Sequence, residues 1–581
     1  MVKPKKEKKP ALTGVLAEYE KKYIAGAPAE QKKEWQALKS QLEDIISTKK
    51  APGISKRAEL PLILLATPEI ILLPSNMGNL VNVIATGDGG GVADISGALA
   101  IELNSQGLNV HVALPEYKHL FQALTDMSRA DYELLKREID DHSRIHLVAD
   151  DMFSAAKSVY DDQTSGLEKI NLRKANAFQR GVISRILPEL KTQNNNILVH
   201  CNDWMTGLIP AAAKSQGIMS LMTLHNTFTY NQWPKGLHKH SIDIEPFWEY
   251  IYFRQHPHVF GSSYKDNYEK NEVDFMTSGL FASDFINTVS PTFLKELVEG
   301  YFHEHHIMPD HMRDVIRHRF YHGSATGILN APLITADPRK DPEIVQKYWH
   351  KTNGKKDIVG LTEGKQKNKL YFQQKTGLEV NPDKPLFFWP SRLSRPQKGF
   401  ELLLKVIPGL MQESNMQIAV VANGDPYLIY EIRKYQEAFN GRVSYIPFSR
   451  QLSQIGKAGA DFILMPSLYE PCGIPQVEAP RYGTIPVVRR TGGLADTVQE
   501  LSTNGFQGNG FLFDDFLPSG LNYAIRNALN FYSREPDFKE KVQARIMDES
   551  FAKFNIKNTA DQYIKVYQEI LDRNRTGLKV K

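Results

Sequence analysis

The residues with the clearest capacity for chemistry lie between positions 466 and 498, in the run PSLYEPCGIPQVEAPRYGTIPVVRRTGGLADTV. An acidic residue, Glu470, follows the end of an expected strand, and the helix entry Gly473–Pro475 comes directly after it. A second strand leads into another glycine loop, Thr491-Gly492-Gly493. Backbone N–H groups at such bends can approach a phosphate, whose charge a helix N-terminus favours. Since a carboxylate would repel that anion, Glu470 is better placed to hold a sugar hydroxyl, and the pattern predicts a nucleotide-sugar site.

Other short motifs follow one another along the chain. They are DGGGVAD (88–94), HCNDWMTGLIPA (200–211), TLHN (223–226), NTVSPTF (287–293), GILNA (327–331), SRLSRPQKG (391–399) and NGDP (423–426). In this order, and together with EPCG and RYGTIPVVRRTGGLADTV, they resemble the motifs of bacterial glycogen synthases and plant starch synthases. These are retaining glucosyltransferases. The resemblance covers roughly residues 80–500 and implies an α/β chain of the GT-B fold, in which two Rossmann-like domains face a central cleft.

The composition is that of an ordinary globular chain. Of 581 residues, 24% are charged and 41% hydrophobic, which is typical of soluble domains. The net charge of +5 arises at the ends, because residues 1–10 hold five Lys and one Glu and residues 573–581 hold two Arg and two Lys. The ends therefore sum to +8 and the body to −3. We expect no basic face and no binding of nucleic acid.

Cysteine content and apolar runs bear on the compartment. Two cysteines, Cys201 and Cys472, exclude a disulfide framework and a cysteine-based zinc module. The start MVKPKKEKKP precedes no apolar segment of the kind that a secretory signal needs. The apolar run at 60–73 is interrupted by Pro and Glu and is too short to cross a bilayer. We therefore expect a cytoplasmic protein without membrane contact.

Strand and helix patterns alternate from about residue 60, which is typical of parallel sheets flanked by helices. The expected strands cover 80–86, 109–115, 196–203 and 221–226 in the first half, and 385–393, 416–425, 442–448, 461–467 and 485–490 in the second. We divide the chain into a charged helical extension (1–57), an N-terminal Rossmann-like domain for the acceptor (58–352), a linker (353–383), a C-terminal Rossmann-like domain for the nucleotide sugar (384–555), and a C-terminal helix with a basic tail (556–581). The resemblance implies that this last helix crosses back to the first domain.

Two basic residues, Arg392 and Lys398, follow the first expected strand of the second domain. Arginine can hold phosphate oxygens with two parallel hydrogen bonds, and lysine adds a point charge. The resemblance implies that this pair neutralises the leaving diphosphate in place of a divalent metal, so we expect no metal and no cofactor. The segment SRLSRPQKG is one residue longer between Arg and Lys than is usual in the family, which makes Arg395 a second candidate for this role.

The EPCG segment carries the donor contacts. By resemblance, Glu470 contacts hydroxyl groups of the donor glucose, while the backbone at Gly473 and Ile474 faces the diphosphate. Pro475 stands where the family usually has Thr and lacks an N–H, although Pro suits the first position of a helix. Glu478 follows eight residues after Glu470, as in the paired glutamates of the broader retaining GT-B transferases, whose second member binds the ribose. An ordinary surface glutamate is the alternative.

Two polar residues end strands of the first domain. His225, in TLHN, corresponds by resemblance to the active-site histidine near the transferred glucose, and a structural histidine is the alternative. Asp203, in HCNDW, corresponds to a contact with glucose or acceptor. Its alternative role is N-capping of the helix that begins directly after it.

The first glycine loop departs most from the family. The synthases have Lys followed by Thr or Val and then Gly-Gly-Leu, whereas this chain has Asp88 ahead of Gly90 and Gly91. An aspartate near a diphosphate lowers affinity unless it turns toward the sugar or the acceptor. Sucrose-forming relatives carry Asp in this loop, so Asp88 bears on the choice of donor and acceptor.

One histidine-rich segment, HEHHIMPDH (303–311), contains four His and two acidic residues. Such residues can bind metal ions, but their spacing matches no zinc module. We expect a surface insertion here, not a metal site.

The resemblance implies transfer of glucose from ADP-glucose to the non-reducing end of an α-1,4-glucan. Arg392 and Lys398 would stabilise the departing diphosphate, and Glu470 and His225 would hold the glucose. The terminal 4-hydroxyl would attack from the same face. Two alternatives stay open: a transferase that uses another nucleotide sugar, such as UDP-glucose, or a small-sugar acceptor, and a catalytically weak glucan-binding scaffold.

Overall fold

The computed structural model describes residues 60–77, 81, 84, 91–125, 128, 130–133, 144–154, 156, 158–160, 168–255, 263–332, 335–351 and 357–575. All of these residues belong to the unit Leu60–Lys581. The extension 1–57, most of the expected strand 80–86, and the loop residues Asp88 and Gly90 lie outside the described residues.

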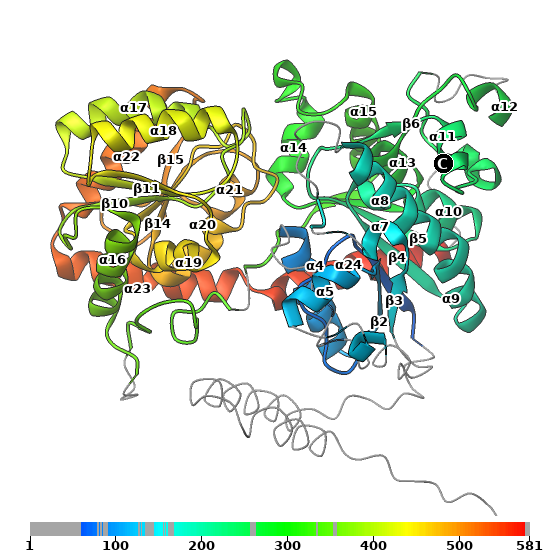
Figure 1. Cartoon of the computed structure of the whole chain (residues 1–581), viewed down its shortest axis with the longest axis horizontal. Helices are drawn as coiled ribbons and strands as arrows, with labels where there is room; N and C mark the ends of the chain where they lie inside the picture. The colour runs from blue at the N-terminus through cyan, green and yellow to red at the C-terminus, as the bar shows by residue number, and fades with distance from the viewer. Residues whose placement is uncertain are drawn as a thin grey trace, which may run out of the picture. The chain divides into compact units, whose positions relative to one another are not determined.

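The first sheet is parallel, with strand order β3-β2-β1-β4-β5-β8-β9 (Figure 1). Its strands are β1 (Leu62–Ala66), β2 (Asn109–Pro115), β3 (Ile145–Val148), β4 (Ile197–Asn202), β5 (Met219–Leu224), β8 (Phe285–Thr288) and β9 (Ala325–Gly327). The predictions at 109–115, 196–203 and 221–226 are confirmed to within a few residues. The inner strand β1, which lies between β2 and β4, was not predicted, and neither were β3, β8 and β9. The five residues of β1, LILLA, are all buried, as expected where helices cover both faces of a sheet.

The second sheet is also parallel, with order β12-β11-β10-β13-β14-β15. Its strands are β10 (Leu386–Trp389), β11 (Gln417–Val421), β12 (Val443–Ile446), β13 (Phe462–Met465), β14 (Ile485–Arg489) and β15 (Phe511–Phe513). The five strands predicted for this half are confirmed. The strand order reverses between β10 and β13, and in open α/β sheets ligands bind beyond the carboxyl ends of strands at such a switch point. The segments carrying Arg392, Lys398 and Glu470 begin there.

Helices lie on both faces of each sheet (Figure 1). Those of the first half are α4 (Gly91–Ser105), α5 (Lys118–Thr125), α7 (Asp151–Ser154), α8 (Glu168–Gly181), η3 (Val182–Ile186), α9 (Leu187–Gln193), η4 (Trp204–Thr206), α10 (Ile209–Ser215), α11 (Pro234–Lys239), η5 (Glu245–Tyr250), α12 (Tyr264–Asn267), α13 (Phe275–Ala282), α14 (Pro291–Glu299), η6 (His303–His305) and α15 (Asp310–Tyr321), with a small antiparallel pair β6 (Asn231–Gln232) and β7 (Val273–Asp274). Those of the second half are α16 (Leu361–Thr376), α17 (Phe400–Glu413), α18 (Pro426–Ala438), α19 (Arg450–Gly459), α20 (Pro475–Glu478), η7 (Ala479–Tyr482), α21 (Gly492–Thr497), α22 (Pro518–Tyr532), α23 (Pro536–Lys553) and α24 (Ile556–Arg575). None of the helices in these described ranges is long and apolar enough to span a membrane.

The C-terminal helix α24 packs against the first sheet. Tyr567 Oη lies 2.8 Å from His200 Nδ1 on β4, and Asn287 Nδ2 on β8 donates to Tyr563 Oη at 2.9 Å. Both tyrosines are buried. The helix therefore ties the end of the chain to the first half.

Helix α16 occupies much of the range 353–383, which we expected to be a linker, and it packs against the second half. Buried Lys365 donates from Nζ to the carbonyl oxygen of Ala460 at 2.8 Å and to Thr484 Oγ1 at 2.7 Å. Asn368 is also fully buried and donates to the carbonyl oxygen of Gln346 at 2.8 Å. The polar composition of this range suggested a linker. The polar side chains are instead buried, because hydrogen bonds in the folded structure satisfy them, and a sequence pattern does not reveal such hydrogen bonds.

Candidate functional site

Glu470 lies just after β13 and is only 4% exposed. Its carboxylate accepts two hydrogen bonds from Lys398 Nζ, at 2.7 and 3.0 Å, and one from Ser467 Oγ at 3.0 Å. Lys398 comes from the segment between β10 and α17. The structure thus joins two predicted site residues in one ion pair. Because an ammonium group has three N–H donors, Lys398 can hold this carboxylate and still contact a phosphate.

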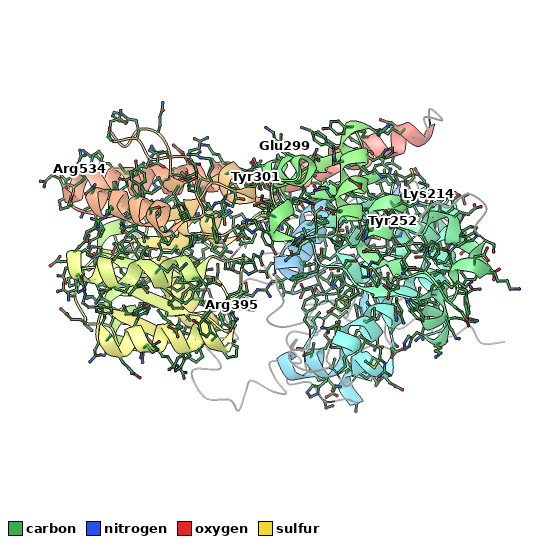
Figure 2. The ribbon with its side chains drawn as sticks, turned by 90° about the horizontal axis from the view of Figure 1, so that it is seen from above. Lys214, Tyr252, Glu299, Tyr301, Arg395 and Arg534 are labelled. Atoms are coloured by element: carbon green, nitrogen blue, oxygen red, sulfur yellow. The ribbon has the colours of Figure 1, made fainter. Side chains whose placement is uncertain are left out.

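The two arginines near β10 differ in their surroundings. Arg392 is exposed and has no hydrogen bond or ion pair within the described part of the chain. Burial raises the pKa of nearby Tyr469 to about 12, and the charge of Arg392 opposes that rise. Arg395, which is labelled in Figure 2, donates from Nε to Asp425 Oδ2 at 2.7 Å and lies over the ring of Tyr427. Arg392 is therefore the arginine available for an anion.

The turn after Glu470 offers backbone donors. Gly473 and Ile474 are partly exposed, and their N–H groups have no acceptor among the described residues. Gly473 has a φ of +74°, which favours glycine. Pro475 is the first residue of α20. From the other half, Gly91 at the start of α4 approaches this turn, since a Cβ on Gly91 would lie 4.0 Å from Ile474 Cγ1. Adjacent free N–H groups of this kind suit a diphosphate.

The Thr491-Gly492-Gly493 loop is buried, and its N–H groups are already satisfied. Gly492 N donates to both carboxylate oxygens of Glu296, at 3.0 and 3.1 Å, and Gly493 N donates to the carbonyl oxygen of Glu470 at 2.9 Å. A Cβ on Gly492, whose φ is +43°, would lie 2.0 Å from that same carbonyl oxygen. We expected this loop to face phosphate. Its observed contacts instead pack it against the backbone that carries Glu470.

His225 and Asp203 lie together at the carboxyl ends of β5 and β4. Asp203 Oδ1 accepts from the backbone N–H groups of His225 at 2.9 Å and Asn226 at 3.3 Å, and the Asp203 side chain does not cap the following turn η4. His225 Nε2 lies 3.0 Å from Asn202 Oδ1. Since Asn202 Nδ2 donates to the carbonyl oxygen of Ala66, we assign Nε2–H as the donor to Oδ1, which leaves His225 Nδ1 as an acceptor.

The ionisation of these two residues follows from burial. Burial raises the pKa of Asp203 to about 7, although the two backbone N–H groups oppose the rise. Burial lowers the pKa of His225 to about 4. The imidazole is therefore neutral near pH 7, suited to accepting a hydrogen bond from a hydroxyl group and not to donating a proton.

Glu478 is not a surface residue, since it is 2% exposed and accepts from Lys457 Nζ at 2.6 Å. It faces Asp94 in the first turn of α4, whose pKa is raised to about 7 by burial and by the charge of Glu478. The positive charges of Arg450 and Lys457 lower the pKa of Asp94 and so oppose this rise. Carboxylates from both halves thus lie next to the Gly91 and Ile474 turns. Asp94 belongs to the motif DGGGVAD but was not among the predicted site residues.

The histidine-rich segment forms no metal centre in the described structure. His303 Nδ1 lies 3.0 Å from an Arg313 nitrogen and 3.2 Å from Asp310 Oδ1, while His311 Nε2 is 2.9 Å from buried Asp274. Among the residues that the structure describes, no cluster of three or more His, Cys, Asp or Glu side chains could hold a metal ion.

Comparisons with known proteins identify the family to which the sequence is similar. Residues 83–309 match the family of the starch synthase catalytic domain, and residues 372–545 match glycosyl transferases group 1. The glycogen synthases of Geobacillus thermodenitrificans and Geobacillus stearothermophilus are each 30% identical over 511 residues, which is 84% of this chain and 96% of theirs. That of Bacillus licheniformis is 31% identical over 82% of this chain and 94% of its own.

Solved structures show the same fold. The catalytic domain of starch synthase IV from Arabidopsis thaliana, solved with ADP and acarbose, superposes with a TM-score of 0.66 at 21% identity. The match covers 88% of this chain and all of that one. The two parallel sheets are therefore the two Rossmann-like domains of a GT-B fold, as the sequence predicted.

Proposed function

Because this chain belongs to the glycogen and starch synthase family of GT-B glycosyltransferases, we propose that it transfers glucose from ADP-glucose to the non-reducing end of an α-1,4-glucan with retention of configuration. The observation that carries the proposal is the convergence at the end of β10 and β13. There the Lys398–Glu470 ion pair lies near Arg392, which has no hydrogen-bond or ion-pair partner among the described residues. The N–H groups of Gly473 and Ile474, which find no acceptor in the same described ranges, follow within four residues of Glu470.

The leaving group is handled by cations and backbone donors. Arg392 can hold two phosphate oxygens at once, and the N–H groups of Gly473 and Ile474 can donate hydrogen bonds to further phosphate oxygens. Lys398 adds a point charge beside Glu470. As the bond between the anomeric carbon and the diphosphate oxygen breaks, this preorganised set stabilises the negative charge that develops, which is commonly the largest contribution to such catalysis.

The glucose is held by acceptors. Glu470, oriented by Lys398 and Ser467, accepts from a sugar hydroxyl, and neutral His225 accepts from another through Nδ1. A carboxylate already engaged by an ammonium and a hydroxyl group is a poor nucleophile, so no covalent intermediate is assigned. The acceptor 4-hydroxyl forms the new bond to the anomeric carbon on the face that the diphosphate leaves, and its proton passes to a diphosphate oxygen.

The purified protein should be incubated with ADP-glucose or UDP-glucose, with and without glycogen, while release of nucleoside diphosphate is measured. The proposal predicts glycogen-dependent release that favours ADP-glucose. A preference for UDP-glucose, or release that requires a small sugar, would reassign donor or acceptor within the family. Silence with both donors, while the protein still sediments with glycogen, would point to a glucan-binding scaffold.

A further inference from the structure

Helices α14 and α21, which belong to different halves of the chain, are joined by hydrogen bonds from the start of each helix to a carboxylate on the other. Glu296 on α14 is 9% exposed, and its carboxylate accepts from Gly492 N at 3.0 and 3.1 Å and from Thr491 Oγ1 at 3.0 Å. In return, Asp496 on α21 accepts from Thr292 N at 3.1 Å and from the hydroxyl group of Ser290, the N-cap of α14. Each carboxylate thus satisfies N–H and O–H donors at the start of the other helix.

The loop that Glu296 contacts is hydrogen-bonded in turn to the backbone of Glu470 in the proposed donor site. Gly493, next to the residue that Glu296 holds, donates to the carbonyl oxygen of Glu470 at 2.9 Å. The Cα of Gly492 lies so close to this carbonyl that no side chain fits between them. A shift of the loop must therefore move the backbone of Glu470, whose side chain contacts Lys398.

We propose that Glu296 is a positioning residue for the donor site. It contacts no donor itself, but it fixes the Thr491–Gly493 loop and, through the loop, the position of Glu470. Because Glu296 belongs to the first half and the loop to the second, donor affinity depends on the two halves being in contact through this carboxylate. The inference rests on the proposed function only in taking Glu470 as a donor contact.

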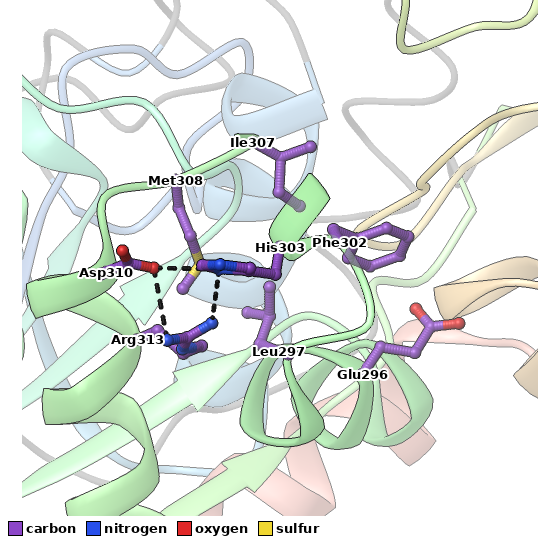
Figure 3. A pocket seen from close by; sticks show the side chains of 9 residues that line it. Glu296, Leu297, Phe302, His303, Ile307, Met308, Asp310 and Arg313 are labelled. Carbon is purple, nitrogen blue, oxygen red and sulfur yellow. Dashed lines mark hydrogen bonds and ion pairs between the residues drawn. The ribbon is translucent and has the colours of Figure 1, made fainter. Parts of the chain in front are cut away.

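The charges around Glu296 define its ionisation. Burial raises its pKa to about 6, opposed by Gly492 N–H, Thr491 hydroxyl and Arg489, whereas Asp496 adds to the rise. On its other side lies a small pocket lined by the His303–Asp310–Arg313 cluster, and in Figure 3 the Glu296 carboxylate points away from that cluster. A protonated carboxyl group is a weaker acceptor than the carboxylate, so the contacts with Gly492 N–H and the Thr491 hydroxyl group weaken as the pH falls through about 6.

Three variants test the proposal. Glu296→Gln keeps the shape but replaces one acceptor oxygen by an NH₂ group, and Thr491→Val removes the hydroxyl donor at constant size. The control, Glu299→Gln, changes an exposed glutamate on the same helix, whose Lys295 contact is long at 3.8 Å (Figure 2).

Two readouts are required. Without any ligand, amide hydrogen exchange over 491–494 should accelerate about tenfold in Glu296→Gln and not in the control. With donor, Glu296→Gln should raise the Kd for ADP and the KM for the active donor about tenfold while kcat falls by less. Thr491→Val should raise the Kd for ADP and the KM for the donor by less. In the double variant Glu296→Gln/Thr491→Val, the two effects on the Kd for ADP should not be additive, because the two side chains share one hydrogen bond. Wild-type donor affinity should fall as the pH drops below about 6, and the part of this fall that Glu296 causes should be absent in Glu296→Gln.

Wild-type exchange rates, wild-type donor affinity and an unchanged pH profile in Glu296→Gln would overturn the inference. A uniform fall in thermal stability with unchanged KM and pH profile would also overturn it, because it would indicate a purely structural role. If the wild type itself binds and turns over no nucleotide sugar, the proposed function fails instead, while the exchange experiment still reports on the loop.

Discussion

The Glu470→Gln substitution gives the sharpest local test of the site. In the wild type, Glu470 and Lys398 pair at 2.7 Å with side chains that are 5% and 15% exposed. The amide would keep one acceptor oxygen but present an NH₂ group toward the ammonium. The variant therefore removes the charge partner of Lys398 with little change of shape.

The expected magnitudes follow from burial. Removing one partner of a buried ion pair costs about 3–5 kcal/mol, and since Lys398 keeps some contact with solvent we expect about 2 kcal/mol of lost stability. A hydrogen bond from a sugar hydroxyl to a charged acceptor contributes about 1.5–3 kcal/mol. Its loss corresponds to a fall of about ten- to hundredfold in kcat/KM.

The matched control is Glu363→Gln on α16. Its partner Lys367 lies at the same distance, 2.7 Å, but the side chains are 55% and 48% exposed, so we expect a change below about 0.5 kcal/mol. Denaturant unfolding and nucleoside diphosphate release would be measured for both variants. A Glu470→Gln protein with the control's stability and kcat/KM would refute the reasoning.

Three other predictions follow from the same geometry. Arg392→Ala should raise the donor KM about tenfold without lowering the melting temperature, because this exposed guanidinium has no partner in the described structure; an unchanged KM would contradict this. Gly492→Ala should lower the free energy of unfolding by about 2–4 kcal/mol, since the new Cβ would clash with a carbonyl oxygen. Gly409→Ala, at an exposed position inside α17 with open space around it, should raise the free energy of unfolding by about 0.5–1 kcal/mol. Denaturant unfolding would measure both changes. His225 should stay neutral from pH 5 to 8 because burial lowers its pKa to about 4; a ring NMR signal titrating near pH 6.5 would contradict this.

The sequence predicted the strands of the second domain well because buried parallel strands are continuous apolar runs with polar residues at their ends. It also placed Glu470, Lys398 and Arg392 at neighbouring strand ends. The strand β1 was missed although its run, LILLA, is apolar throughout, because the apolar residues around it were considered only as a possible membrane span.

The sequence pattern could not predict contacts between residues that lie far apart along the chain. Glu296 looks like any glutamate on an amphipathic helix, and its partners Thr491 and Gly492 lie almost 200 residues away along the chain. The polar residues of α16 suggested a linker for a similar reason. Their hydrogen-bond partners lie on other segments and come close only in the folded chain. The observed partners of the Gly492 and Gly493 N–H groups, Glu296 and the carbonyl oxygen of Glu470, depend on the same long-range packing.

Retaining transfer of glucose to an α-glucan can be measured by incubating the protein with glycogen and ADP-glucose labelled with ¹³C at the anomeric carbon, and following the label by NMR. We expect the label to appear in the polymer as an α-1,4-linked glucosyl unit that α-amylase can release. Label found only in free glucose, or in a β-linked product, would contradict this expectation.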